Sequence, residues 1–342
     1  MSQLVARVTE GHDLEEAEAE FAFDRIMAGE ASPVQMAALL AALRTKGHAP
    51  SEVAGGVRAL RTAMVPVPVG SLDRPLVDTC GTGGGSVTTF NISTAAALVA
   101  AASGVRVAKH GNRSFTSRSG SADVLKAMGV RIDLTPDAMA RTLGRAGIVF
   151  MFAPLLHPAM RHVGPVRREL GIPTIMNLLG PLTNPAGVRR QVVGVSDPTL
   201  AGLVAEALHA LGHQRALVVH GEPGMDEVSP MGETRVMDVT PAGIRSSRIS
   251  PEELGLEPAS PAEIAGGEPE ENAEVILRVL RGEDRRGART VTLLNAAAAL
   301  LVGDVAKDWA DGVSRAAEAV DSGAALETLE TLRTASREEG AR

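Results

Sequence analysis

The pattern of apolar residues changes near residue 70, and this change constrains the fold more than any other feature of the chain. Before it, apolar residues recur only at helical spacing. After it, short apolar runs alternate with helical patterns, which predicts an α/β fold with a mainly parallel sheet covered by helices on both faces. The predicted strands are 76–80, 105–110, 148–153, 191–195 and 216–220, and the predicted helices between them are 93–103, 119–128, 136–146 and 198–211.

Residues 1–66 predict a small helical domain. Apolar residues in Leu14–Met27 follow a helical period. A second helix is expected to begin after Ser32, because a proline follows it and Gln35 stands where a capping box requires a glutamine or glutamate. This helix is expected to end at Gly47, since glycine commonly follows the last helical residue.

A third helix is predicted over 50–64, and the prolines of 65–75 indicate a linker, because proline cannot continue a helix. The larger α/β domain is expected to cover 67–342. We expect the segment near 158–185 to pack with the helical domain. Residues 261–340 again predict helices, including an apolar stretch, LLNAAAALLVG, that is expected to be buried.

Composition excludes several classes of protein. The net charge is −7, with 34 cationic residues of which only four are Lys, so the surface does not favour nucleic acid or an anionic membrane. Cys80 is the single cysteine, which excludes an intrachain disulfide, and no zinc-ligand spacing is present. The N-terminus lacks the apolar core of a signal peptide, and the apolar run near Ala95–Ala102 is too short to span a bilayer. We expect a soluble cytoplasmic protein.

A glycine-rich loop follows the first predicted strand. Gly81–Ser86 leads into a helix whose start carries Asn91, Ser93 and Thr94. A strand, a glycine-rich turn and a helix start form an anion site, because the backbone N–H groups and the positive end of the helix dipole face the ligand. The spacing matches neither the dinucleotide fingerprint nor the P-loop. The alternative is a glycine-rich loop that has a capped helix and no ligand.

A second polar loop follows the next predicted strand. In an acidic protein, cationic and hydroxyl side chains at the carboxyl end of a strand suggest phosphate binding. The alternatives are a solvated basic loop or residues that cap the following helix. The cationic and amide residues are Lys109, His110, Asn112, Arg113 and Arg118, and the hydroxyl residues are Ser114, Thr116, Ser117, Ser119 and Ser121.

Two adjacent carboxylates, Asp226 and Glu227, follow the strand predicted over 216–220. Mg²⁺ prefers one or two carboxylates together with waters and the phosphate oxygens of a substrate. This position, opposite two phosphate-type loops, favours a metal site. The alternative is an ordinary exposed pair of surface charges.

The segment 153–185 is rich in Arg and His. An arginine on a helix can hold a substrate carboxylate in two hydrogen bonds. The alternative, a solvated helix face, is favoured for Arg161 and Arg168, and the turn-rich stretch that begins at Asn177 is interpreted as structural. The remaining cationic candidates are His157, His162 and Arg167.

Six motifs together resemble the anthranilate phosphoribosyltransferases, and the resemblance extends from about residue 14 to beyond residue 300. They are GTGG…NIST, AKHGNR, SGSADVL, HPAMRHV…VRRELG, NLLGPLTNP and HGEPGMDEVSP, in this order. The resemblance implies a homodimer in which each subunit has a hinge cleft between its small helical domain and its α/β domain. It also implies transfer of the 5-phosphoribosyl group from phosphoribosyl pyrophosphate to the amine of anthranilate. The products would be N-(5-phosphoribosyl)anthranilate and pyrophosphate, in the second step of tryptophan biosynthesis from chorismate.

The resemblance also implies roles for individual residues, with charge stabilisation by Lys109 and Mg²⁺ in place of a catalytic triad. Residues implied to bind phosphoribosyl pyrophosphate are Gly81, Thr82, Gly83, Gly84, Thr89, Asn91, Ser93, Thr94, Lys109, His110, Gly111, Asn112 and Ser121. Residues implied at the anthranilate site are Gly81, Asn112, His157 and Arg167, and the implied Mg²⁺ ligands are Ser93, Asp226 and Glu227. One departure is Gly85, which stands where the family often has Asp.

Two rival functions follow from the same fold. The first is a pyrimidine nucleoside phosphorylase, whose lysine loop carries a different motif and which Asp226, Glu227 and Arg167 disfavour. The second is a nucleic-acid-binding relative without catalytic activity. The net charge of −7 opposes it, as do Asn112 and Arg167.

Overall fold

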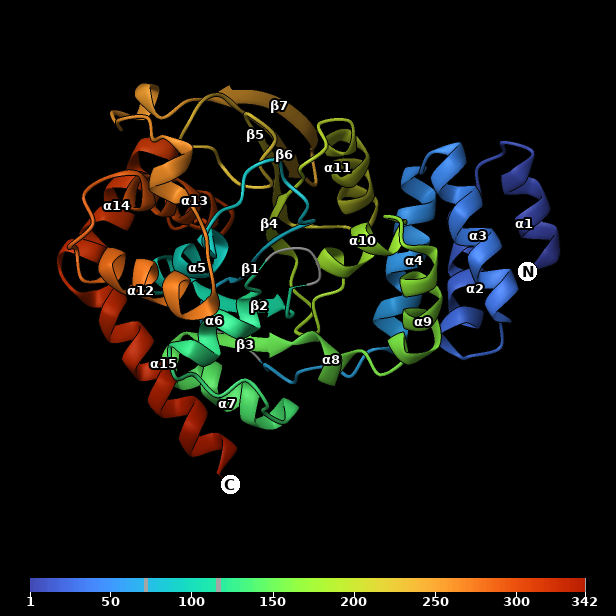
Figure 1. The fold of residues 1–342 in the computed structure, drawn as a ribbon, viewed down its shortest axis with the longest axis horizontal. Coiled ribbons are helices and arrows are strands. Elements are labelled where there is room, and N and C mark those ends of the chain that lie inside the picture. Colours follow the sequence, from blue (N-terminus) through green and yellow to red (C-terminus); the bar gives the residue numbers. More distant parts are fainter. Residues whose placement is uncertain (71–72, 115–117, 342) are drawn as a thin grey trace.

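The computed structural model describes residues 1–70, 73–114 and 118–341, so Thr116 and Ser117 of the predicted phosphate loop lie outside it. Helices form the N-terminal end of the molecule (Figure 1). The capping box is confirmed, because Ser32 Oγ accepts a bond from Gln35 N at 3.2 Å and Gln35 Oε1 accepts one from Ser32 N at 3.0 Å. The helices are α1 (Ser2–Thr9), which the pattern analysis did not assign, α2 (Glu16–Met27), α3 (Pro33–Lys46) and α4 (Pro50–Ala63).

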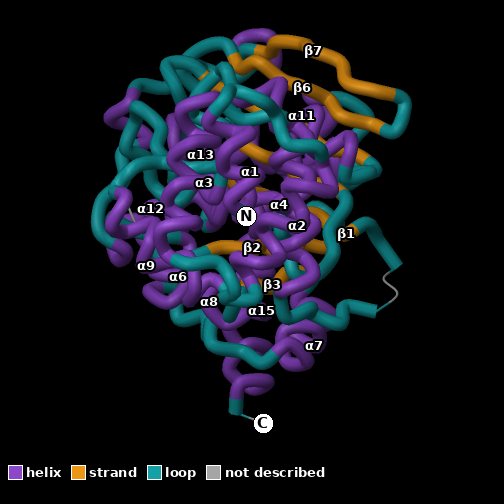
Figure 2. The backbone as a smooth tube through the Cα atoms, turned by 90° about the vertical axis from the view of Figure 1, so that its right-hand side faces the viewer, coloured by secondary structure: helices purple, strands orange, loops and turns teal. Residues whose placement is uncertain are grey.

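The described residues form a seven-stranded sheet with the order β3-β2-β1-β4-β5-β6-β7. Figure 2 shows the strands stacked behind the helical end. All five predicted strands are present and parallel, which confirms the fold class. The last two strands were not predicted and pair antiparallel. The strands are β1 (Leu76–Gly81), β2 (Arg106–Gly111), β3 (Ile148–Phe152), β4 (Arg190–Gly194), β5 (Arg215–Gly221), β6 (Thr234–Thr240) and β7 (Gly243–Ile249).

Helices cover both faces of the sheet, and different hydrophobic clusters lie on the two faces. The cluster on one face includes Leu98, Phe150 and Leu294, and it is built largely by α5 and the C-terminal helices. The helices of the α/β part are α5 (Ile92–Ala102), α6 (Ser121–Ala127), α7 (Pro136–Ala146), α8 (Ala153–Leu156), α11 (Leu200–Ala210), α12 (Pro269–Leu280), α13 (Gly287–Val302), α14 (Trp309–Asp321) and α15 (Ala324–Gly340). Among the helices of the described residues, none combines the length and apolar character needed to cross a membrane.

The second cluster runs from the helical end to the other face of the sheet. Helix α9 (Met160–Leu170) packs against α2 and α3, and α10 (Met176–Leu179) packs against α4, as Figure 1 shows. Helix α11 also contacts α4. Phe23, Leu179 and Val204 therefore belong to one continuous core, although they come from α2, α10 and α11.

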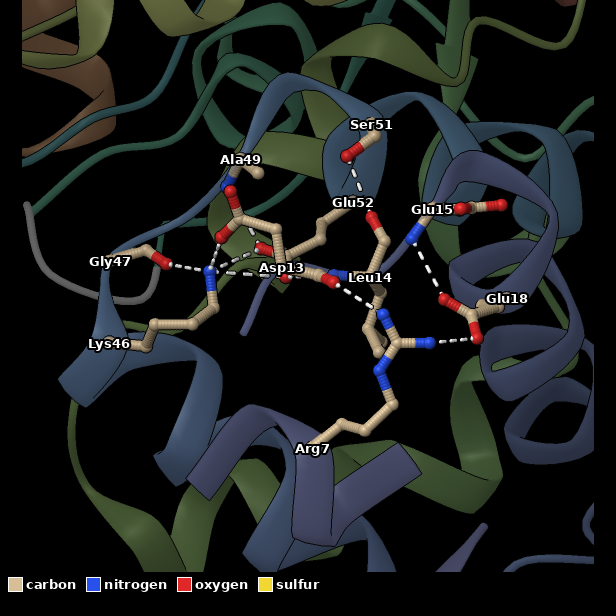
Figure 3. A network of polar contacts seen from close by, with 10 residues as sticks. All are labelled: Arg7, Asp13, Leu14, Glu15, Glu18, Lys46, Gly47, Ala49, Ser51 and Glu52. Atoms are coloured by element: carbon tan, nitrogen blue, oxygen red, sulfur yellow. Dashed lines mark hydrogen bonds and ion pairs between the residues drawn. The ribbon is translucent and has the colours of Figure 1, made fainter. Parts of the chain in front are cut away.

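A buried carboxylate fixes the loop between α3 and α4 (Figure 3). Glu52 is 0% exposed, and it accepts bonds from the backbone N–H groups of Leu14 at 3.1 Å and Ala49 at 2.8 Å. Lys46 Nζ donates to the same carboxylate at 3.2 Å. Because a buried charge needs partners, this network holds the ends of both helices together, and with them the loop that carries His48.

Candidate active site

A cavity of about 570 Å³ opens at the carboxyl ends of the strands, between the α/β part and the helical end. Ligands bind at this edge in open α/β sheets. Most residues implied for the two substrates and the metal line this cavity. They are Gly81, Thr82, Gly83, Gly84, Asn91, Ser93, Lys109, His110, Gly111, Asn112, Ser121, Asp226 and Glu227. Four implied residues are not on its wall, namely Thr89, Thr94, His157 and Arg167.

The glycine-rich loop after β1 touches the acid pair directly. Gly83 and Gly84 have φ values of 71° and 79°, a left-handed conformation that favours glycine. A Cβ at Gly81 would lie 2.2 Å from Asp226 Oδ2, so a side chain there would displace that carboxylate. The N–H of Gly83 donates to the same oxygen at 2.7 Å. This N–H is therefore bonded to the acid pair, whereas the sequence analysis expected it to face a phosphate.

Lys109 is a buried cation at the floor of the cavity. It is 3% exposed, and its Nζ donates to Thr79 O at 2.7 Å and to Ser93 Oγ at 3.1 Å. Burial lowers the pKa of Lys109, and the negative charge of Asp78 opposes this effect. The alternative of a solvated basic loop is therefore wrong for Lys109, because its ammonium group is held by fixed oxygens.

Asp78, in the middle of β1, is a buried carboxylate that the sequence analysis missed. Its oxygens accept bonds from His110 N at 3.2 Å and from Asn184 Nδ2 at 2.8 Å. Asn184 also donates to Ala108 O at 2.9 Å. Asp78 thus joins β1 and β2 to the segment that leads into β4. A charged residue inside a strand predicted to be buried on both faces was the signal that could have revealed it.

The acid pair is half-buried, so the alternative of an ordinary exposed surface pair is wrong. Burial and then the charge of Asp226 raise the pKa of Glu227 well above its usual value. The two carboxyl groups also share a hydrogen bond, and both line the cavity. A cation that approached them would replace the shared proton, because it favours the ionised form of both groups.

The donors near this pair fit Mg²⁺. They are carboxylate and hydroxyl oxygens from Asp226, Glu227 and Ser93, which line one small cavity of about 10 Å³ beneath the main one. Among the described residues, no three His, Cys, Asp or Glu side chains form a metal cluster. A few protein oxygens completed by substrate phosphates are the pattern that Mg²⁺ prefers, whereas a closed protein cage is not.

Two histidines touch each other at the cavity wall. His110 Nε2 lies 3.2 Å from His157 Nε2, so one of these nitrogens donates and the other accepts. Burial and the neighbouring His157 lower the pKa of His110 to about 3, and burial lowers the pKa of His157 to about 4. Both rings are neutral at pH 7. His110 lines the cavity and His157 lies behind it.

Two implied ligands, Asn91 and Thr89, have structural partners, and a third, Thr94, does not line the main cavity. Asn91 Nδ2 donates to Ser119 O at 3.1 Å, and its Oδ1 accepts from Asn272 Nδ2 at 3.0 Å, so the amide links three segments. Thr94 is 1% exposed and faces the core beside Leu98, away from the main cavity. Thr89 pairs with Ala265 in an isolated β-bridge.

The helical side of the cavity contains residues that the sequence analysis did not select. Arg44, on α3, lines the cavity and makes no hydrogen bond or ion pair with any described residue. His48 lines it too, and its Nδ1 is buried without a partner among residues 1–70, 73–114 and 118–341. Burial lowers the pKa of His48 to about 4, and the charges of Arg44 and Lys46 add to this effect.

Arg167 does not line the cavity, but it contacts a residue that does. Its Nη2 donates to Asn177 Oδ1 at 3.4 Å, and Asn177 lines the cavity. Burial lowers the pKa of Arg167. Asn177, which the sequence analysis interpreted as structural, therefore contributes to the site as well. Other lining residues outside the predicted set are Cys80, Gly120, Pro173, Thr174, Leu178, Ser196, Asp197 and Leu200.

Comparison with protein families finds two matching domain models from one family. Residues 2–64 match the helical bundle domain of a glycosyl transferase family, and residues 73–326 match the a/b domain of that family. The fold and the site thus define a glycosyl transferase of this class. An anthranilate phosphoribosyltransferase from Roseiflexus sp. (strain RS-1) is 50% identical over 337 residues, which is 97% of each chain. The chain belongs to the anthranilate phosphoribosyltransferase family.

Solved structures of the family have the same fold. Anthranilate phosphoribosyltransferase from Thermus thermophilus is 45% identical, with a TM-score of 0.92 over 98% of this chain and 99% of that one. The Saccharomyces cerevisiae enzyme in complex with PRPP and Mg is 27% identical, with a TM-score of 0.86 over 98% of both chains. A further structure of the yeast enzyme holds 4-fluoroanthranilate.

Proposed function

We propose that this chain transfers the 5-phosphoribosyl group from phosphoribosyl pyrophosphate to the amine of anthranilate, giving N-(5-phosphoribosyl)anthranilate and pyrophosphate. This would be the second step of tryptophan biosynthesis from chorismate. The observation that carries the proposal is the single cavity that joins the glycine-rich loop, Lys109 and the acid pair to Asn112. Family membership supports it, since the Roseiflexus relative of that name matches over 97% of both chains. The nucleoside phosphorylase and nucleic-acid-binding alternatives are not favoured.

Lys109 and the start of α5 are proposed to face the pyrophosphate. Negative charge grows on its bridging oxygen as the bond to the sugar breaks, and a fixed ammonium group stabilises that charge without reorganising. Ser93, Asp226 and Glu227 would hold Mg²⁺, which supplies further charge neutralisation when bound. The yeast relative has been solved with PRPP and Mg, which supports this use of the metal.

Asn112 and Arg167 are proposed to bind anthranilate, with His110 and His157 beside its path. The aromatic amine of anthranilate is uncharged at pH 7, so no strong base is required to activate it. The lowered pKa values of His110 and His157 agree with that requirement, because neutral rings can hydrogen-bond to anthranilate without adding charge. Most of the acceleration is then expected from proximity, orientation and charge stabilisation.

The division into domains is proposed to serve closure. We assign 1–66 and the segment near 158–185 to a helical domain that moves as one body against the rest of the α/β domain. Closure would bring Arg44 and Arg167 toward the glycine-rich loop and exclude water from the activated sugar. The homodimer and the cytoplasmic location stay predictions.

The decisive assay follows the loss of anthranilate fluorescence in the presence of phosphoribosyl pyrophosphate and Mg²⁺. We expect turnover with this pair and none with uridine and phosphate. Consumption of uridine instead would establish the phosphorylase alternative. Binding to DNA at moderate salt, without turnover of either pair, would establish the nucleic-acid-binding one.

The metal assignment is tested with a double substitution, Asp226→Asn with Glu227→Gln. We expect it to abolish turnover, because the charge that holds the metal is removed while the shape of both side chains is kept. Glu222→Gln, in the same loop but exposed, is the matched control and should retain activity. Circular dichroism and thermal melting check that both proteins are folded. Full activity in the double variant, or in excess chelator, would contradict the assignment.

A further inference from the structure

Asn295 is a buried amide in the middle of α13, the apolar stretch that the sequence analysis expected to be buried. All residues of this helix except Arg289 are buried, and Asn295 is 6% exposed. An amide in such surroundings is costly unless its donors and acceptor are all bonded. Its partners therefore indicate why the helix carries an asparagine at this position.

Most of its hydrogen bonds go to the residue that directly follows the acid pair. Asn295 Oδ1 accepts from Val228 N at 2.9 Å, and Asn295 Nδ2 donates to Val228 O at 3.0 Å. The second amide proton is donated to Val291 O at 2.8 Å. One side chain thus pairs with both backbone groups of Val228, in the way that a neighbouring strand would.

The opposite side of the acid-pair backbone rests on two glycines. A Cβ at Gly194, the last residue of β4, would lie 1.5 Å from Asp226 O. A Cβ at Gly221, the last residue of β5, would lie 2.5 Å from Glu227 O. The backbone of residues 226–228 is therefore held between the ends of two strands and α13, and it cannot shift toward the strands.

We propose that Asn295 is a positioning residue, which fixes the backbone of the acid pair so that Asp226 and Glu227 face Ser93 before a metal and substrate arrive. The small cavity beneath the site supports this, because Asn295, Ser93 and both carboxylates line it together. The inference rests on the proposed function in one respect, that the acid pair binds Mg²⁺. Groups that orient metal ligands commonly change metal affinity when they are lost.

The test compares Asn295→Leu with Thr292→Val. Thr292 lies in the same helix, and its hydroxyl donates to Ala288 O within that helix, at 2.7 Å. Hydrogen exchange is measured at the amide of Val228 in the metal-free proteins. We expect exchange roughly tenfold faster or more in Asn295→Leu, and wild-type exchange in Thr292→Val. The Mg²⁺ concentration for half-maximal rate should rise roughly tenfold in Asn295→Leu only.

Asn295→Ser is prepared in parallel, because it leaves room for a water and is expected to fold even if the leucine variant does not. It should change both readouts in the same direction. Wild-type exchange at Val228 in a folded Asn295 variant would overturn the proposal, and so would faster exchange with an unchanged Mg²⁺ requirement. If wild type itself needs no Mg²⁺, the metal assignment of the proposed function fails, whereas a metal-dependent wild type with unaltered Asn295 variants refutes this inference alone.

Discussion

The two walls of the cavity are built in different ways. On the α/β wall, Lys109 donates to two fixed oxygens, and Asp226 accepts a bond from Gly83 N. On the helical wall, Arg44 has no ion pair with a described residue, and His48 Nδ1 is buried without a partner among them. The polar groups named on the α/β wall thus have protein partners without a ligand. Those on the helical wall are still available to a ligand or to residues that approach on closure.

A buried polar chain behind the α/β wall explains the contrast. Asp78 accepts from Asn184 at 2.8 Å and from Gln191 Nε2 at 3.4 Å, and Gln191 Oε1 lies 2.9 Å from His213 Nε2. These groups hold the strand ends in one geometry. The helical wall is anchored differently, by Glu52 beneath the loop that carries His48, so its own cavity-facing side chains keep their freedom.

The largest expected effect is on stability, and it compares the walls directly. Asp78→Ala removes one acceptor each from His110 N, Asn184 and Gln191, and it removes the charge opposite Lys109. We expect the free energy of unfolding to fall by about 3–5 kcal/mol, the usual cost of breaking a buried charge network. Arg44→Ala should change it within about 0.5 kcal/mol. Urea unfolding of both variants checks this, and equal losses would refute the distinction between the walls.

The next effect concerns the carboxylate of anthranilate. Arg167→Ala should lower kcat/KM for anthranilate by a factor equivalent to about 2–4 kcal/mol, if the guanidinium pairs with that carboxylate in a desolvated site. The value of kcat/KM for phosphoribosyl pyrophosphate should change far less. Arg168→Ala is the matched control, since Arg168 is exposed on the same helix. An equal effect on both substrates would mean that Arg167 only supports Asn177.

Acid should weaken the buried chain behind the α/β wall through His213. Burial, aided by the charge of Arg61, lowers the pKa of His213 from 6.5 to about 4, although its bond to Leu208 O opposes the shift. The unfolded chain therefore binds a proton at higher pH than the folded one. Stability from this group is constant above pH 6.5 and falls as the pH drops toward 4, by on the order of 2–3 kcal/mol.

The measurement is urea unfolding from pH 8 to pH 4, on wild type and on His213→Gln. The variant should have a flatter pH dependence, whereas His209→Gln, an exposed histidine on α11, should match wild type. Stability that rises in wild type on acidification, and not in His213→Gln, would show that His213 carries protons on both ring nitrogens.

The smallest expected effect concerns Gly85, where the family often has Asp. A Cβ there would lie 3.0 Å from Gly224 O and 3.7 Å from Asp226 Oδ1, so a carboxylate would add to the acid pair. We expect Gly85→Asp to be inhibited by high Mg²⁺, because a further carboxylate attracts a second ion, while wild type is not. Gly85→Ala is the matched control, because it adds the same Cβ without the negative charge. A gain in rate at every Mg²⁺ concentration would instead show that the natural loop is impaired.

Local sequence patterns were sufficient for most of the parallel sheet, because its strands are apolar runs that end in glycine or polar loops. They failed for β7, whose sequence GIRSSRI is largely exposed and has no apolar face to detect. Thr94 was assigned to the phosphate site together with Ser93, but successive residues on a helix point about 100° apart. Ser93 therefore lines the cavity, and Thr94 faces the core.

Other site residues could not be found locally. Arg44 lies in a helical pattern that does not differ from that of a solvated face, and it reaches the cavity only because α3 packs within the helical end that faces the carboxyl ends of the strands. Asp78 and Asn295 did carry a signal, a polar residue inside an apolar element. Such a residue indicates a buried network, but the sequence alone does not name the partners.

The continuous core of α2, α3, α4, α9, α10 and α11 has a consequence for how the chain folds during synthesis. Phe23 and Leu40 belong to a cluster that is completed by Val163, Leu179 and Val204, which come much later in the chain. The first four helices pack partly on one another, but they leave the ribosome before α9, α10 and α11, which cover the rest of their apolar faces. The N-terminal helices are therefore synthesised first, but their packing is completed late. A chain cut after residue 66 would expose apolar surface that promotes aggregation.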